Sequence, residues 1–122
     1  MTTKAAGEFT VTAVSDGQLR TTHDVILGID RDEAVRLTGV PYGQHLVIDV
    51  NAFVIRRGGK VMVSDAGTGH TYGPTLGHLP KNLRAAGVAP EDVDAILLTH
   101  MHPDHSWAWS TRPAKRCFPR PS

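Results

Sequence analysis

The sequence contains little cysteine and has no long apolar run. Its single cysteine, Cys117, excludes an internal disulfide and any zinc site built from four cysteines. The first eight residues lack the apolar core of a secretory signal peptide, and no stretch reaches the roughly twenty apolar residues of a membrane span. We therefore expect a cytoplasmic protein with no membrane partner.

Acidic residues are missing from the end of the chain, because all twelve lie at or before Asp104. Four of the thirteen basic residues follow position 106, which leaves nine basic residues and a net charge of −3 for residues 1–106. A nucleic-acid surface is not indicated for that acidic body. Binding through the basic tail would require a salt-dependent affinity that the body opposes.

Apolar patterning predicts a small strand-rich domain. Alternation over residues 9–15 predicts a half-buried strand that ends in a turn at residues 15–18, with residues 19–23 as a possible return strand. Residues 46–55 and 61–63, joined by Arg57-Gly58-Gly59-Lys60, predict a β-hairpin. The apolar run at residues 94–98 predicts a buried strand.

Two helices are expected between these strands. Asp30 with Glu33 three residues later predicts a helix N-terminus, and Gly39-Val40-Pro41 predicts its end. This helix could form the rim of a pocket or simply cover surface. A second helix should begin near Leu79, because Pro80 fits only a first turn. Residues 89–93 should then form a connector with a helical turn.

The densest chemical signal, His100-Met101-His102-Pro103-Asp104-His105, follows the strand at 94–98. In an extended segment, His100 and His102 lie on the same side and can reach one ion. Pro103 turns the chain, which lets Asp104 and His105 point to a nearby position. Imidazole and carboxylate ligands suit Zn²⁺, with Mn²⁺, Fe²⁺ or Co²⁺ as alternatives. The structural alternative is a surface histidine cluster on an irregular loop.

This segment resembles the H-x-H-x-D-H signature of the metallo-β-lactamase superfamily. The resemblance implies that His100 and His102 bind a first metal ion and that Asp104 and His105 bind a second, with zinc at both positions. It also implies that a bound water is the nucleophile and that Asp104 positions this water or takes its proton. Asp65, in Ser64-Asp65-Ala66-Gly67, would orient the site through hydrogen bonds rather than bind metal.

Residues 45–106 are most similar to methyl parathion hydrolases and lactonase-type members of that superfamily. The implied fold class is α/β (α+β): the N-terminal half of an αββα sandwich, with a mostly antiparallel or mixed sheet and one or two helices. The implied substrate is a small ester, lactone or phosphotriester, although substrate is the least transferable property within a fold.

In that family, further metal ligands come from sequence downstream of the motif, and none of the remaining histidines matches their positions: His23, His45, His70 and His78. We therefore expect half of a two-metal site within these residues. The alternative is an inert fragment or metal-binding module. A half-sandwich would expose an apolar sheet face, which could drive homo-oligomerisation.

We divide the chain into a partial domain, residues 1–106, and an irregular tail, residues 107–122. The tail has no apolar period and contains both tryptophans. We expect it to be disordered or the product of a shifted reading frame. Permitted codons from Ala108 onward, read in another frame, encode Leu-Val-Asp-Glu-Ala-Gly-Lys-Ala-Val-Phe-Pro, which resembles what family members carry there. A natural basic tail is the alternative.

The shifted-frame hypothesis predicts that the source DNA, read in a second frame beyond codon 107, encodes the histidines and bridging aspartate of the family. Sequencing that DNA tests it. An intact frame through codon 122 with no such alternative would refute the hypothesis.

Overall fold

The computed structural model describes residues 1–69, 72–103 and 105, and its five strands form one mixed sheet in the order β1-β2-β3-β4-β5. The first three pairings are antiparallel and β4 pairs with β5 in parallel. With two α-helices, this confirms the expected fold class. The strands are β1 (Thr2–Ala6), β2 (Phe9–Thr21), β3 (Leu46–Arg57), β4 (Lys60–Ser64) and β5 (Ala95–Leu97).

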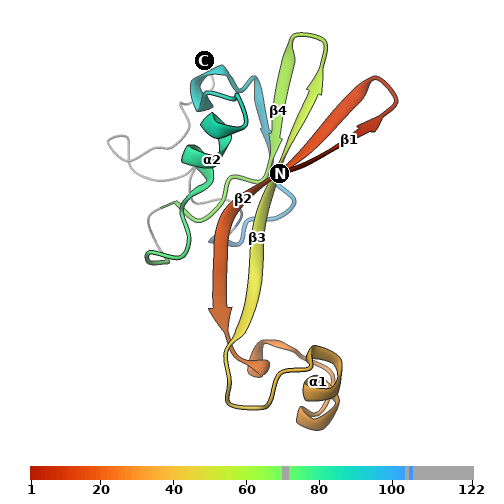
Figure 1. Cartoon of the computed structure of the whole chain (residues 1–122), viewed down its shortest axis with the longest axis vertical. Coiled ribbons are helices and arrows are strands. Elements are labelled where there is room, and N and C mark those ends of the chain that lie inside the picture. Colours follow the sequence, from red (N-terminus) through yellow and green to blue (C-terminus); the bar gives the residue numbers. More distant parts are fainter. Residues whose placement is uncertain (70–71, 104, 106–122) are drawn as a thin grey trace.

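One face of the sheet is covered by helix α2 (Leu79–Ala85), which lies against the strands in Figure 1. The core between them consists of Val14, Ala52, Val54, Val63, Ala66, Leu79, Leu83 and Val88. Strand alternation places Phe53 on the opposite face, where its side chain is 40% exposed. The described residues therefore build one covered layer and leave apolar side chains on the other face.

The segments predicted as a hairpin and as a second helix are confirmed. Val54 pairs with Val63 and Arg57 pairs with Lys60 around the turn at Gly58 and Gly59. Pro80 lies in the first turn of α2, where its missing N–H costs no helical hydrogen bond. The connector contains a 3₁₀ turn, η2 (Pro90–Asp92).

Strand β5 corrects the expectation of a buried strand at residues 94–98. It spans three residues at the edge of the sheet, and Leu97 is 49% exposed. Periodicity reports only how apolar a segment is, so the run could not distinguish a central strand from an edge strand.

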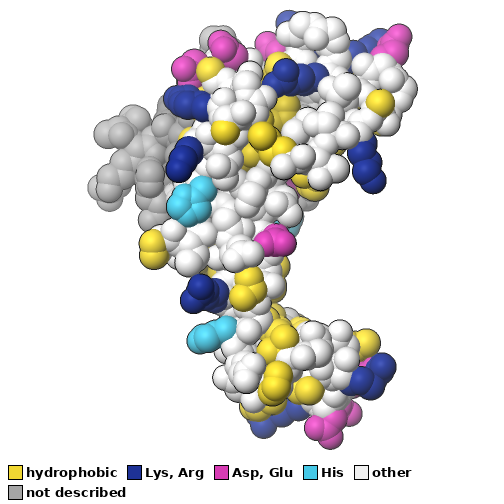
Figure 2. Space-filling view, viewed as in Figure 1, with side chains coloured by type: hydrophobic (Ala, Val, Ile, Leu, Met, Phe, Trp, Pro, Cys, Tyr) yellow, Lys and Arg dark blue, Asp and Glu magenta, His cyan; other side chains and the backbone are white. Residues whose placement is uncertain are grey.

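The distal halves of β2 and β3 leave the rest of the sheet as a two-stranded arm (Figure 1). At its end lie the 3₁₀ turn η1 (His23–Val25) and helix α1 (Arg31–Thr38). The predicted cap is confirmed, since Asp30 accepts a hydrogen bond from the Glu33 amide at 2.8 Å. Gly39 ends the helix in the left-handed conformation. Apolar side chains are exposed on this lower lobe (Figure 2), including Leu27 and Leu37.

The expected turn at residues 15–18 is wrong, because β2 continues through it to Thr21 along β3. The register shifts between Ser15 and Gly17, so Asp16 is the extra residue of a β-bulge. Asp-Gly is a strong turn signal, but here the pairing of β2 with β3 persists on both sides of it. The bulge turns the Asp16 side chain into the protein interior, where it is fully buried.

The division at residue 106 is not tested, because residues 106–122 lie outside the described residues. No helix in the described part of the chain is long and apolar enough to cross a membrane.

Replacing Gly17 with Ala should lower the free energy of unfolding by roughly 2–4 kcal/mol, measured by urea denaturation. Gly17 has φ +126°, and an added Cβ would overlap the backbone carbonyl of Thr75. Gly28→Ala is the control, because Gly28 has φ +85° and nothing within 4 Å of an added Cβ. It should cost only about 1 kcal/mol. Equal losses in the two variants would contradict the close-packing argument.

Candidate metal-binding site

The site is built on a buried loop of five residues, 65–69, which follows β4 and which we call the strap. A buried loop needs partners for its backbone groups. The Asp65 amide donates to the Leu97 carbonyl at 2.7 Å, and the Ala66 amide donates to the His105 carbonyl at 2.7 Å. The strap is therefore tied directly to both ends of the segment that carries the histidine motif.

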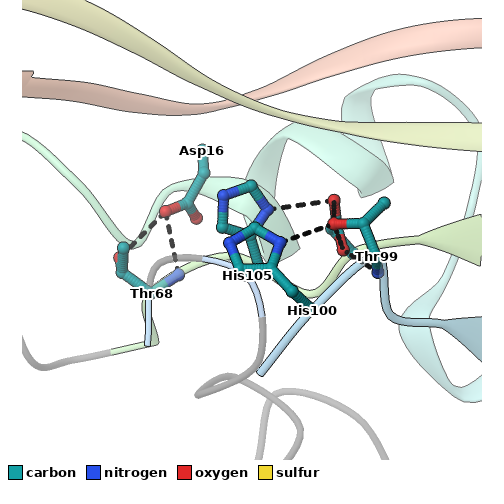
Figure 3. A network of polar contacts seen from close by, with 6 residues as sticks. Asp16, Thr68, Thr99, His100 and His105 are labelled. Atoms are coloured by element: carbon teal, nitrogen blue, oxygen red, sulfur yellow. Dashed lines mark hydrogen bonds and ion pairs between the residues drawn. The ribbon is translucent and has the colours of Figure 1, made fainter. Parts of the chain in front are cut away.

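Asp65 is the polar centre of this arrangement. Its carboxylate accepts hydrogen bonds from the Thr99 amide at 2.8 Å, the Thr99 hydroxyl at 3.0 Å and His105 Nδ1 at 3.0 Å. Figure 3 labels the two donor residues, Thr99 and His105. It is the one non-glycine residue with positive φ among those described, at 66°. A strained backbone at such a position is typical of functional sites.

Burial raises the pKa of the Asp65 carboxyl, but hydrogen bonds from Thr99 and His105 together lower it by more. The pKa consequently lies below its ordinary value of 3.8, and the group is an anion at neutral pH. An ionised carboxylate only accepts hydrogen bonds, so every partner of Asp65 must donate.

This requirement fixes the proton positions on two imidazole rings. His105 must carry its proton on Nδ1 to donate to Asp65, which in the neutral ring leaves Nε2 with a lone pair. The Thr99 hydroxyl gives its only proton to Asp65, so its oxygen accepts from His100 Nδ1 at 2.9 Å. In a neutral His100 ring, a proton on Nδ1 likewise leaves Nε2 unprotonated.

The three motif histidines lie together. The ring centroid of His100 is 4.6 Å from that of His102 and 4.1 Å from that of His105. Asp104, the fourth predicted ligand, lies outside the described residues. Among the residues that are described, no group of three His, Cys, Asp or Glu side chains is arranged to hold a metal ion. The donor chemistry fits a divalent ion such as zinc, whereas no coordination sphere is preformed by the described side chains.

Two of the other histidines are engaged in ordinary hydrogen bonds. His23 is buried on the arm and its Nε2 lies 2.9 Å from the Val40 carbonyl. His78 Nε2 lies 2.9 Å from the Pro74 carbonyl. His45 is exposed and His70 lies outside the described residues.

Sequence reasoning missed Asp16 and Thr68, which contact each other in Figure 3. Thr68 belongs to the strap, and Asp16 lies on β2. Asp16 accepts from the Thr68 amide at 3.1 Å and from the Thr68 hydroxyl at 2.8 Å. The one available signal was an Asp-Gly pair inside a strand-forming run, which can mark a bulge as well as a turn.

The sequence also matches a family model. Residues 45–111, more than half of the chain, match the model of the metallo-beta-lactamase superfamily. This chain therefore belongs to the metallo-β-lactamase superfamily. No curated protein matches the sequence.

Several solved structures share this fold. A hydrolase of the β-lactamase superfamily, AbOPH, is 29% identical with a TM-score of 0.81 over 96% of this chain and 41% of its own. AidC, described as a dizinc quorum-quenching lactonase, is 23% identical with a TM-score of 0.71 over 85% of this chain and 37% of its own. A probable metal-dependent hydrolase from Staphylococcus aureus is 18% identical with a TM-score of 0.71, covering 84% and 41%. The chain thus spans about two-fifths of the length of these proteins.

Replacing Asp65 with Asn should destabilise the protein by about 1–3 kcal/mol, measured by chemical denaturation. Asn tolerates the positive φ but places an NH₂ group against the donors of Thr99 and His105. Asp49→Asn is the control, because Asp49 is exposed and accepts from Gln18 on the neighbouring strand. Its effect should stay within about 0.5 kcal/mol. A loss no larger for Asp65→Asn than for this control would show that the network is not stabilising.

Proposed function

We propose that this chain carries the N-terminal part of a metal-dependent hydrolase that cleaves an ester, lactone or phosphotriester in a small-molecule substrate. The observation that carries the proposal is the hydrogen-bond network of Asp65, which orients the His105 ring directly and the His100 ring through the Thr99 hydroxyl, each at its Nδ1. A histidine that binds metal through one ring nitrogen usually donates the N–H of the other nitrogen to a neighbouring acceptor. Here the acceptor is the Asp65 carboxylate for His105 and the Thr99 hydroxyl for His100.

The ligand set follows the sequence motif. His100 and His102 would hold one ion, and Asp104 and His105 would hold a second. Zinc suits imidazole and carboxylate donors best, while Mn²⁺, Fe²⁺ or Co²⁺ remain chemically compatible. When bound, the ions would supply a water of lowered pKa and polarise the carbonyl or phosphoryl oxygen of the substrate. The description of AidC as a dizinc lactonase supports both the metal and the substrate class.

The residues of this chain supply orientation and proton transfer. Asp65 holds His105 directly and His100 through the Thr99 hydroxyl, so that both rings keep the protonation that metal binding requires. Asp104 would position the attacking water or accept its proton as general base. No serine or cysteine nucleophile would be needed, because the ions, when bound, would supply a water of lowered pKa as the nucleophile.

A second candidate is a catalytically inert metal-binding module. Catalytic zinc normally has three protein ligands, whereas the motif provides two for each ion. The described residues likewise contain no group of three side chains arranged around an ion. Relatives whose chains are more than twice as long have room for the remaining ligands.

We further propose that the protein acts in the cytoplasm without a nucleic-acid or membrane partner. The apolar sheet face around Phe53 and Leu97 is a candidate surface for self-association.

The wild-type chain should retain Zn²⁺ at micromolar concentration in a chelator-competition titration. His105→Ala should weaken this binding more than about tenfold, because losing a ligand should exceed the effect of losing an outer hydrogen-bond partner. His45→Ala is the control, since His45 is exposed and lies outside the motif. It should bind zinc like the wild type.

Turnover distinguishes the two candidate functions. Two tightly held equivalents of zinc with hydrolysis of a lactone, aryl ester or phosphotriester would support the enzyme. Zinc binding without hydrolysis of any of these would support the inert module. Failure of the wild type to retain zinc at all would refute both.

A further inference from the structure

Asp16 is a fully buried carboxylate that none of the roles proposed above uses. It is the extra residue of the β2 bulge, which points its side chain away from solvent toward the strap. Burying an ionised carboxylate is costly unless its oxygens are hydrogen-bonded. Its surroundings should therefore reveal what it holds in place.

Four donors from two other segments converge on Asp16. Oδ2 accepts from the Thr68 amide at 3.1 Å, the Thr68 hydroxyl at 2.8 Å and the Gly77 amide at 3.2 Å. Oδ1 accepts from the Leu79 amide at 3.0 Å. One carboxylate thus joins the N-terminal strand β2 to the strap and to the first residue of α2.

The backbone packs closely around this carboxylate. A Cβ at Gly67 would overlap Asp16 Oδ1, and one at Gly77 would overlap the Gly69 carbonyl. Because glycine has no Cβ, the strap can approach the carboxylate closely enough for the hydrogen bonds of Thr68 to form. Side chains at Gly67 or Gly77 would therefore prevent this close contact between the strap and its neighbours.

The same strap holds the candidate metal site from its other side. Ala66, two residues before Thr68, donates its amide to the His105 carbonyl at 2.7 Å. Asp65, three residues before Thr68, binds the His105 ring and Thr99. A shift of Thr68 would move a buried segment of five residues whose opposite end sets the imidazoles.

We propose that Asp16 is a positioning residue for the metal site, acting through Thr68 and the strap on Asp65 and His105. The inference rests on the function proposed above. Asp16 touches neither the substrate nor the metal ligands in this role. Its carboxylate fixes one side of the strap, and Asp65 transmits that position to the histidines on the other side.

Thr68→Val tests the proposal most directly, because valine has nearly the shape of threonine but lacks the hydroxyl that donates to Asp16. We expect it to weaken Zn²⁺ affinity roughly tenfold, as is typical for outer hydrogen-bond partners of a metal site. Thr68→Ser keeps the hydroxyl and should bind zinc within about twofold of the wild type. Asp16→Asn should match or exceed the loss in Thr68→Val, and exposed Asp49→Asn is its control.

A metal-free readout separates positioning from general stability. The Ala66 amide donates to the His105 carbonyl, and the Thr99 amide donates to the Asp65 carboxylate. Hydrogen exchange of these two amides should accelerate at least about tenfold in Thr68→Val but not in Thr68→Ser. Exchange of the central β3 amides should stay unchanged. If Asp16→Asn does not fold, the two Thr68 variants decide the question alone.

The proposal is overturned if Thr68→Val keeps wild-type zinc affinity and wild-type exchange at Ala66 and Thr99. It is also overturned if the β3 amides accelerate to the same degree, since Asp16 would then only stabilise the fold. If the wild type retains no zinc, the proposed function fails, while the exchange measurement still decides whether Asp16 positions the strap.

Discussion

The structure depends on how a buried loop satisfies its polar groups. The strap lies between two carboxylates, with Asp16 accepting from Thr68 on one side and Asp65 accepting from Thr99 and His105 on the other. Neither carboxylate forms an ion pair with Lys or Arg among the described residues. Both buried carboxyl groups are held here by oriented donors, which fix their geometry more narrowly than a flexible surface ion pair would.

This constraint explains why the site combines segments from the whole described chain. Asp16 comes from an early strand, Asp65 from the loop after β4, and Thr99 from the segment after β5. The parallel pairing of β4 with β5 brings the latter two side by side, because parallel strands end at the same edge of a sheet. The candidate metal ligands then follow directly from the end of β5.

The arm and the open sheet face show that the described residues form only part of a packed domain. Core packing involves one face of the sheet and α2, whereas α1 packs chiefly against η1 at the distal end of the arm. The solved structures of similar fold contain more than twice as much chain, and each aligns with 84% or more of this one. The exposed apolar side chains on the open sheet face thus have no covering layer within the part of the chain that the structure describes.

Local sequence determined much of this protein. The hairpin around Gly58 and Gly59, the Asp30 cap and the start of α2 at Pro80 are all set by neighbouring residues, so their patterns predicted them correctly. The spacing of His100, His102 and His105 likewise indicated a cluster of imidazoles, and their rings do lie together. Family membership followed from the same short motif and was confirmed by the matching family model.

Only the tertiary structure decided the bulge at Asp16, the edge position of β5 and the proton positions on the histidines. These features depend on contacts between residues far apart in the sequence: Leu79 lies 63 residues from Asp16, and Thr99 lies 34 residues from Asp65. No local pattern encodes such a partner. Asp-Gly favours a turn when considered alone. Here the hydrogen bonds that β2 makes to β3 and that Asp16 makes to the strap outweigh that local preference, because breaking them would leave buried polar groups unsatisfied.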